Sequence, residues 1–143
     1  MAAGNIWGPR VMADSAALRV LLVEDSSLLA GRLTELLQRL PDVDLVGTVE
    51  TERDALSRIS TSPPDVLILD LHLRSGSGFG VLRWLKRGPT GQRPKVIILT
   101  NFGLPEYRRE AESLGVEAFL DKSRDYFRLP ALLRDFAKER ASA

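Results

Sequence analysis

The stretch of sequence that decides the fold is Asp65-Val66-Leu67-Ile68-Leu69-Asp70-Leu71. Its four central residues are apolar without alternation, which is typical of a strand covered on both faces of a parallel sheet. Turn residues at positions 62–65 precede this strand, and Asp70 follows it directly. The pattern predicts a central strand whose end carries a carboxylate.

On both sides of this strand, short apolar runs alternate with longer stretches of helical period, which favours an α/β fold. The other strands are predicted at Arg19–Val23, Leu45–Val49, Val96–Leu99 and Glu117–Leu120. Helices are predicted after caps or starts at Ser26 or Ser27, Thr51, Val81, Pro105, and Leu129 or Pro130. Between the third strand and the third helix, we expect a loop opened by Gly76, Gly78 and Gly80.

Five strands alternating with five helices allow few topologies, because βαβ crossovers are right-handed and sequential elements tend to be neighbours. The best fit is a flavodoxin-like, doubly wound parallel sheet of order 2-1-3-4-5 with helices on both faces. The first and third strands are adjacent in this order. A ligand crevice is therefore expected beyond their carboxyl ends.

Composition sets the limits on function. The 143 residues fit one domain at 18–140, with a flexible N-terminal extension at 1–17 and a C-terminal tail at 141–143. The 20 Lys and Arg residues against 19 Asp and Glu give a net charge of +1, so no global field attracts nucleic acid. Cysteine is absent and the apolar runs are too short to span a bilayer, so we expect a cytoplasmic protein without membrane insertion.

Acidic residues follow two strands that the predicted topology makes neighbours. Glu24 and Asp25 come after the first strand and Asp70 after the third, which places three carboxylates at one edge of the sheet. Like charges in a crevice repel one another unless a cation neutralises them or one carboxyl group is protonated. A metal is the simpler solution, and an all-oxygen donor set suits Mg²⁺.

Two further polar residues are expected at the same edge. Thr100 ends the fourth strand and Lys122 lies just beyond the fifth, so a hydroxyl group and an ammonium group are available to an oxyanion. With Asp70 as a carboxylate nucleophile, the set is suited to phosphoryl transfer without a separate general base.

From Leu18 to about Arg140 the chain resembles a CheY-like response-regulator receiver domain. The motifs that carry the resemblance are Leu21-Leu22-Val23-Glu24-Asp25-Ser26, Asp65 to Leu71, Gly78, Thr100 after Val96-Ile97-Ile98-Leu99, and Gly115-Val116-Glu117-Ala118-Phe119-Leu120-Asp121-Lys122. For the metal, the resemblance implies that Asp25, Asp70 and the backbone carbonyl of His72 hold Mg²⁺, with Glu24 acting directly or through water. From the residues alone, Glu24 could equally be a solvated loop acid.

For signalling, the resemblance implies that Asp70 accepts a phosphoryl group from the phosphohistidine of a histidine kinase or a histidine phosphotransfer protein. Thr100 and Lys122 would grip that group, and Phe119 would be the aromatic switch that turns inward as Thr100 moves. The face around the fourth helix, fifth strand and fifth helix would then meet a downstream protein target or form a homodimer. Such a protein modifies only itself, so we expect no enzyme acting on an independent product.

Some positions depart from the family pattern. Arg74 and Ser123 stand where prolines are usual, and Asn101 stands where a small residue is usual. Phe102 lies two positions after Thr100, where side chains screen the acyl phosphate from water. We therefore expect a comparatively long-lived phosphoryl group.

Three alternatives remain open at this stage. A pseudo-receiver would keep the fold as a phosphorylation-independent interaction or dimerisation module. A magnesium-dependent phosphatase with an aspartyl nucleophile would use a similar sheet, although its Asp-x-Asp-x-Thr motif is missing after the first strand. The chain could also be the receiver part of a longer regulator.

Overall fold

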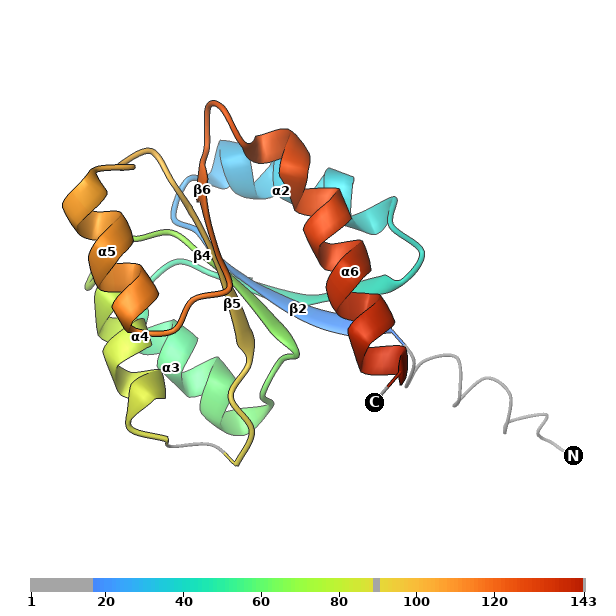
Figure 1. Cartoon of the computed structure of the whole chain (residues 1–143), viewed down its shortest axis with the longest axis horizontal. Coiled ribbons are helices and arrows are strands. Elements are labelled where there is room, and N and C mark those ends of the chain that lie inside the picture. The colour runs from blue at the N-terminus through green and yellow to red at the C-terminus, as the bar shows by residue number, and fades with distance from the viewer. Residues whose placement is uncertain (1–16, 89–90, 143) are drawn as a thin grey trace, which may run out of the picture.

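One parallel sheet forms the centre of the molecule. The computed structural model describes residues 17–88 and 91–142, so most of the predicted N-terminal extension, 1–17, lies outside the described residues. The sheet order is β3-β2-β4-β5-β6, with bounds of Val43–Val49, Leu18–Val23, Val66–Leu69, Lys95–Thr100 and Ala118–Asp121 in that order. Counted along the described chain, this is the predicted flavodoxin-like order 2-1-3-4-5 (Figure 1).

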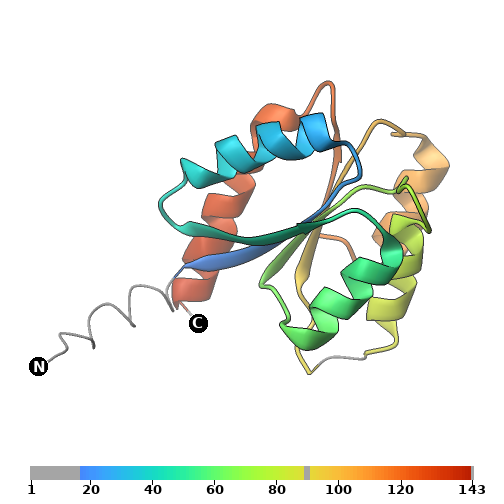
Figure 2. The same cartoon turned by 180° about the vertical axis from the view of Figure 1, so that it is seen from behind.

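Helices cover both faces of the sheet, as predicted. Their bounds are α2 Ser27–Gln38, α3 Glu52–Thr61, α4 Gly78–Lys86, α5 Pro105–Ser113 and α6 Leu129–Ser142. Figures 1 and 2 show α2 and α6 on one face and α3, α4 and α5 on the other. No helix within the described part of the chain is both long and apolar enough to cross a membrane.

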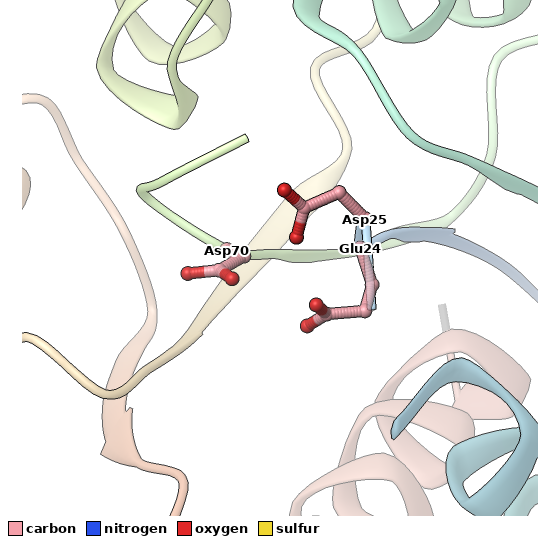
Figure 3. A group of neighbouring side chains, drawn as sticks. All are labelled: Glu24, Asp25 and Asp70. Atoms are coloured by element: carbon pink, nitrogen blue, oxygen red, sulfur yellow. The ribbon is translucent and has the colours of Figure 1, made fainter. Parts of the chain in front are cut away.

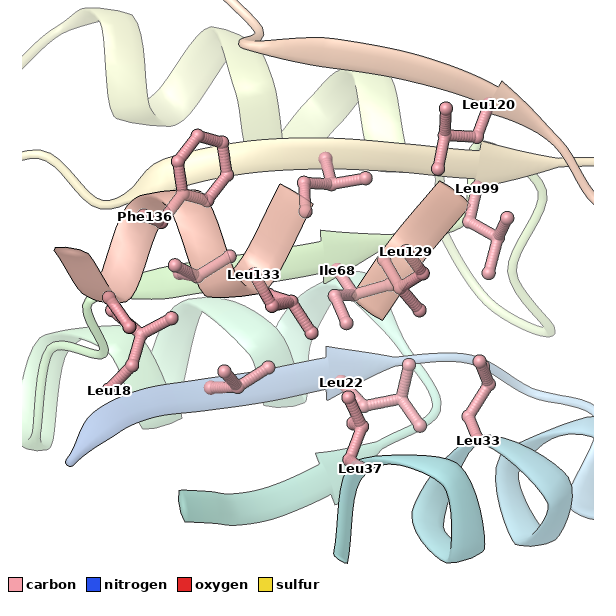
Figure 4. Close-up of a cluster of buried hydrophobic side chains, with 14 residues drawn as sticks. Leu18, Leu22, Leu33, Leu37, Ile68, Leu99, Leu120, Leu129, Leu133 and Phe136 are labelled. Atoms are coloured by element: carbon pink, nitrogen blue, oxygen red, sulfur yellow. The ribbon is translucent and has the colours of Figure 1, made fainter. Parts of the chain in front are cut away.

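The sheet separates two hydrophobic clusters. On one face, Leu33 of α2 and Leu133 of α6 pack against strand residues such as Leu22 (Figure 4). On the other face, α3, α4 and α5 pack against the side chains of the strands that point the opposite way. All four residues of β4 are buried, as its unbroken apolar run predicts. Each large apolar side chain that is buried in this way contributes about 1.5–3 kcal/mol to stability.

Polar side chains fix where the helices begin. Ser26 caps α2, since its hydroxyl oxygen accepts a hydrogen bond from the Leu29 backbone N–H at 3.3 Å, so the first of the two predicted serines is the cap. Thr51 caps α3 in the same way, with the Asp54 N–H at 3.1 Å.

The prediction of a loop through Gly78 and Gly80 was wrong, because α4 already begins at Gly78. Ser77 caps this helix by accepting a hydrogen bond from the Gly80 N–H at 3.1 Å. A Cβ atom at Gly78 would collide with the backbone carbonyl oxygen of Asp70, so glycine is needed here for close approach rather than for a turn.

Smaller differences lie at element ends. β3 starts at Val43 rather than Leu45, because Val43 pairs in register with Leu18. β6 is shifted by one residue from the prediction, and a 3-10 helix, η1 at Tyr126–Arg128, precedes α6 without having been predicted.

Candidate phosphorylation and metal site

Three carboxylates gather beyond the ends of β2 and β4. Parallel pairing continues past both strands, because the Glu24 N–H donates to the Val49 carbonyl at 2.9 Å and the Asp70 N–H donates to the Val23 carbonyl at 3.1 Å. Carboxylate oxygens of Glu24, Asp25 and Asp70 all lie within 4.8 Å of one another. Figure 3 shows the three groups around one small space at this edge. The structure thus brings together the three acids that the sequence placed at one edge.

Lys122 joins two of these acids. Its Nζ atom lies 2.9 Å from Glu24 Oε1 and 2.8 Å from Asp70 Oδ2. The exposed fractions of the side chains are 11% for Lys122, 2% for Glu24 and 6% for Asp70, so little water screens these charges. One ammonium group therefore faces two buried carboxylates, with Asp25 as a third acid close by.

Burial and hydrogen bonding shift two pKa values at this edge. Burial raises the pKa of Glu24, and hydrogen bonds from Lys122 and from the Ser26 N–H offset this only in part. For Lys122, burial alone would lower the pKa, but its hydrogen bonds to Asp70 and Glu24 outweigh burial and the pKa is raised. The site therefore keeps a firmly charged ammonium group beside an acid that resists ionisation.

The remaining predicted residues lie around this group. Thr100 is fully buried at the end of β5, and its hydroxyl oxygen accepts a hydrogen bond from the Phe102 N–H at 3.2 Å. The His72 N–H donates to Asp70 Oδ1 at 3.3 Å, while the His72 side chain is exposed and its ring centroid lies 3.8 Å from that of Phe102. Phe119 lies inward, since only 4% of it is exposed.

The donor set fits a hard divalent cation. All the converging ligand atoms are carboxylate oxygens, they come from two adjacent strand ends, and two of the three acids are buried with a single ammonium to balance them. A divalent cation would remove the excess negative charge. Three protein carboxylates leave an incomplete shell, as Mg²⁺ usually has in phosphoryl-transfer sites.

Sequence comparison identifies the family. A profile described as response regulator receiver domain matches residues 20–134. The chain belongs to this family. Receiver domains are signalling modules of two-component systems rather than conventional enzymes, and Mg²⁺ and a phosphorylated aspartate are typical of them.

Individual relatives agree with this assignment. The receiver domain is 34% identical over 105 residues to the transcriptional regulatory protein DesR of Bacillus subtilis, covering 73% of this chain and 51% of that protein. It is 28% identical over 125 residues to the sensory transduction protein LytT of Bacillus cereus, covering 87% of this chain and 49% of LytT. The chain thus spans about half the length of these curated relatives.

A solved structure is similar over most of its length. The signal receiver domain of a Luxo repressor protein from Vibrio parahaemolyticus superposes with a TM-score of 0.76 at 35% identity, covering 86% of this chain and 92% of that chain. The family profile, which matches residues 20–134, includes the acidic residues and Lys122.

Sequence reasoning missed two features of this edge. The contact between Lys122 and Glu24 was not anticipated, because a lysine after the last strand says nothing about which of several acids it reaches. The large exposed apolar side chains were also missed, namely Leu28, Leu104 and Phe127. For Leu28 a signal existed, since it lies just before the apolar face of the predicted first helix.

Proposed function

We propose that this receiver domain is a phospho-accepting response regulator in which Asp70 takes a phosphoryl group from a phosphohistidine. The observation that carries the proposal is the convergence of Asp70 with Glu24, Asp25 and the Lys122 ammonium in a largely buried site. The donor is a histidine kinase or a histidine phosphotransfer protein.

In the proposed reaction, a carboxylate oxygen of Asp70 attacks the phosphorus atom, the P–N bond to the donor imidazole breaks, and its electron pair returns to the imidazole nitrogen. Bound Mg²⁺, held by Asp25, Asp70 and the His72 carbonyl with Glu24 directly or through water, would supply charge neutralisation. Lys122 and the Thr100 hydroxyl bind the phosphoryl oxygens. A carboxylate nucleophile needs no separate general base to remove a proton.

Exposed apolar side chains around the site support docking of a protein donor. Leu28 is 67% exposed at the start of α2, Phe102 is 46% exposed and Leu104 48% exposed between β5 and α5, and Phe127 is 75% exposed in η1. All four lie in segments that follow the carboxyl ends of strands, so they belong to the same edge of the sheet as the acidic group. Apolar side chains of this kind are the usual anchors of a protein interface.

The phosphoryl group would bias an equilibrium between two states of the domain through Thr100 and Phe119. The guanidinium carbon of Arg108, a residue of α5, lies 4.7 Å from the centroid of the Phe119 ring. Movement of this ring would therefore alter the surface of α5. The face of α5, β6 and α6 would then bind a downstream protein or a second copy of the chain. Residues 18–140 would act as the functional unit, in the cytoplasm and without contact to nucleic acid.

Intact-mass measurement after treatment with acetyl phosphate tests the proposal. The wild type is expected to gain one phosphate adduct when Mg²⁺ is present and none when it is chelated. Asp70→Asn removes the nucleophile and should gain none, whereas Asp44→Asn, which changes an exposed aspartate of β3, should behave like the wild type. An adduct of equal yield in Asp70→Asn would contradict the assignment, and no adduct in any variant would favour a pseudo-receiver.

A further inference from the structure

Glu52, the first residue of α3, makes unusual contacts with the segment that follows Asp70. Its carboxylate Oε1 accepts a hydrogen bond from the Ser77 backbone N–H at 2.9 Å, and its own backbone N–H donates to the Ser75 carbonyl at 3.1 Å. Thr51 and Ser75 form an isolated parallel bridge beside these bonds. The start of α3 is therefore tied at several points to the end of the β4–α4 loop.

Two glycines leave room for this one side chain. A Cβ atom at Gly80 would overlap the Glu52 carboxyl group, and a Cβ atom at Gly76 would overlap the Glu52 Cβ. Gly76 also has a φ of 78°, which itself favours glycine. Gly80 has no positive φ that would favour glycine, and glycine in a helix costs about 0.5–1 kcal/mol of stability relative to alanine. The space that Gly80 leaves is occupied by the Glu52 carboxylate.

The contact continues from Ser77 to the phosphorylation site. Ser77 forms an isolated antiparallel bridge with His72, and the neighbouring Gly78 N–H donates to the Leu71 carbonyl at 2.9 Å. The His72 N–H in turn donates to Asp70 Oδ1 at 3.3 Å. The backbone segment that Glu52 holds is thus paired directly with the residue whose carbonyl is the proposed third magnesium ligand.

We infer that Glu52 is a positioning residue for the magnesium site, acting through Ser77 to fix the backbone of His72. This inference rests on the proposed function, because it concerns the same metal site. Although Glu52 belongs to α3, its carboxylate lies at the amino end of α4, where a negative charge interacts favourably with the helix dipole. Without it, the Ser77 N–H loses its partner and the loop between Asp70 and α4 keeps its backbone ties to α3 at Ser75 but loses the tie at Ser77, so the His72 carbonyl is held less firmly where the metal needs it.

The test measures the Mg²⁺ dissociation constant of the full chain by titration calorimetry, together with the Mg²⁺-induced shift in melting temperature. Glu52→Ala should weaken Mg²⁺ binding about tenfold, the size typical for loss of a group that orients a metal ligand. Glu52→Gln keeps an oxygen that can accept from Ser77 and should retain most of the affinity. Glu50→Ala is the matched control, because Glu50 is a half-exposed acid beside the same junction and forms an ion pair with the exposed Arg74, at 3.6 Å.

Gly80→Ala approaches the same contact from the other side. The added methyl group displaces the Glu52 carboxylate, so this variant should also weaken Mg²⁺ binding, yet it should cause no further loss in the Glu52→Ala background. Melting in the presence of a chelator shows that each variant is folded.

Equal Mg²⁺ affinity in Glu52→Ala and Glu50→Ala would overturn the inference, as would additive losses from Glu52→Ala and Gly80→Ala. If the wild type itself bound no Mg²⁺, the proposed metal site would fail first and the role of Glu52 with it. The wild-type titration therefore distinguishes the two failures.

Discussion

The two edges of the sheet both carry charged side chains, but they differ in burial and in charge balance. At the amino edge, Asp65 lies 3.3 Å from Arg140 and Lys95 lies 3.4 Å from Glu139, and these side chains are 30–59% exposed. They line an open cavity of about 470 Å³, so water reaches them. At the carboxyl edge, Lys122 meets two acids that are almost fully buried, and Asp25 adds a third.

This difference distinguishes exposed ion pairs on the surface from the buried charges of a candidate functional site. Each acid at the amino edge has its own base, and exposed pairs of this kind contribute about 0–1 kcal/mol. The carboxyl edge keeps more negative charge than the Lys122 ammonium can balance, in a place where little solvent screens it. Such an arrangement costs stability unless a cation is bound, which is why we assign function to this edge.

Loss of Lys122 is expected to give the largest effect. Lys122→Met leaves Glu24 and Asp70 buried without a counter-charge, so the free energy of unfolding in the presence of a chelator should fall by about 3 kcal/mol. Saturating Mg²⁺ should recover part of this loss, because it takes over the neutralisation. Lys95→Met at the amino edge is the control and should cost less than about 1 kcal/mol. Denaturant titrations measure both values. Equal losses of unfolding free energy in Lys122→Met and Lys95→Met would contradict the difference between the two edges.

The raised pKa of Glu24 predicts a smaller, pH-dependent effect. The folded chain binds the Glu24 proton more tightly than the unfolded chain does, so this stabilisation is complete below the usual pKa of glutamate and is lost as the pH rises through the folded value. Glu24→Gln has no carboxyl group to ionise at this position, so its stability does not fall with pH in this way.

In metal-free protein, the variant should therefore gain stability relative to the wild type as the pH rises above the usual pKa of glutamate, about 4.3. Chemical denaturation at several pH values measures the difference. A stability difference that does not change as the pH rises above this value would mean that the pKa of Glu24 is not raised in the folded chain.

Phe102 tests how well the carboxyl edge is shielded after phosphorylation. Its ring packs on His72, two residues from Asp70, so Phe102→Ala should admit water and speed autodephosphorylation by less than about tenfold, or about 1.4 kcal/mol of barrier. Leu104→Ala removes another exposed apolar side chain of the same loop and serves as the control. An unchanged or slower rate in Phe102→Ala would remove the reason to expect a long-lived phosphoryl group.

The smallest effect is expected at the amino edge. Glu139→Gln breaks the exposed pair with Lys95 and should lower the free energy of unfolding by at most about 0.5 kcal/mol, and by less in high salt. Thermal melting at two salt concentrations measures it. A loss above about 1 kcal/mol would show that the two edges are less different than their exposure indicates.

Much of the site followed from the sequence because parallel strands have a fixed polarity. Once Val66–Leu69 was recognised as a central strand, Asp70 had to lie at its carboxyl end, and the strand order then placed Glu24 and Asp25 beside it. The fold followed for the same reason, since few arrangements satisfy right-handed crossovers.

The features that were not predicted depend on contacts between distant side chains. Glycines at 76, 78 and 80 indicate a loop locally, but Gly78 and Gly80 lie in α4, and their lack of a side chain is explained by Asp70 and Glu52, which occupy the space next to them. Likewise, nothing in the sequence around Lys122 says that it reaches Glu24 as well as Asp70. Tertiary packing decided these positions, and local propensity could not.

The most direct test of the account is to locate the phosphoryl group. The wild-type chain would be treated with acetyl phosphate and Mg²⁺, the acyl phosphate trapped by reduction, and the modified peptide identified by mass spectrometry. The account predicts modification at Asp70 and none at Glu24 or Asp25, although all three acids share one edge. Modification of either neighbour in place of Asp70, or of the His72 imidazole, would contradict it.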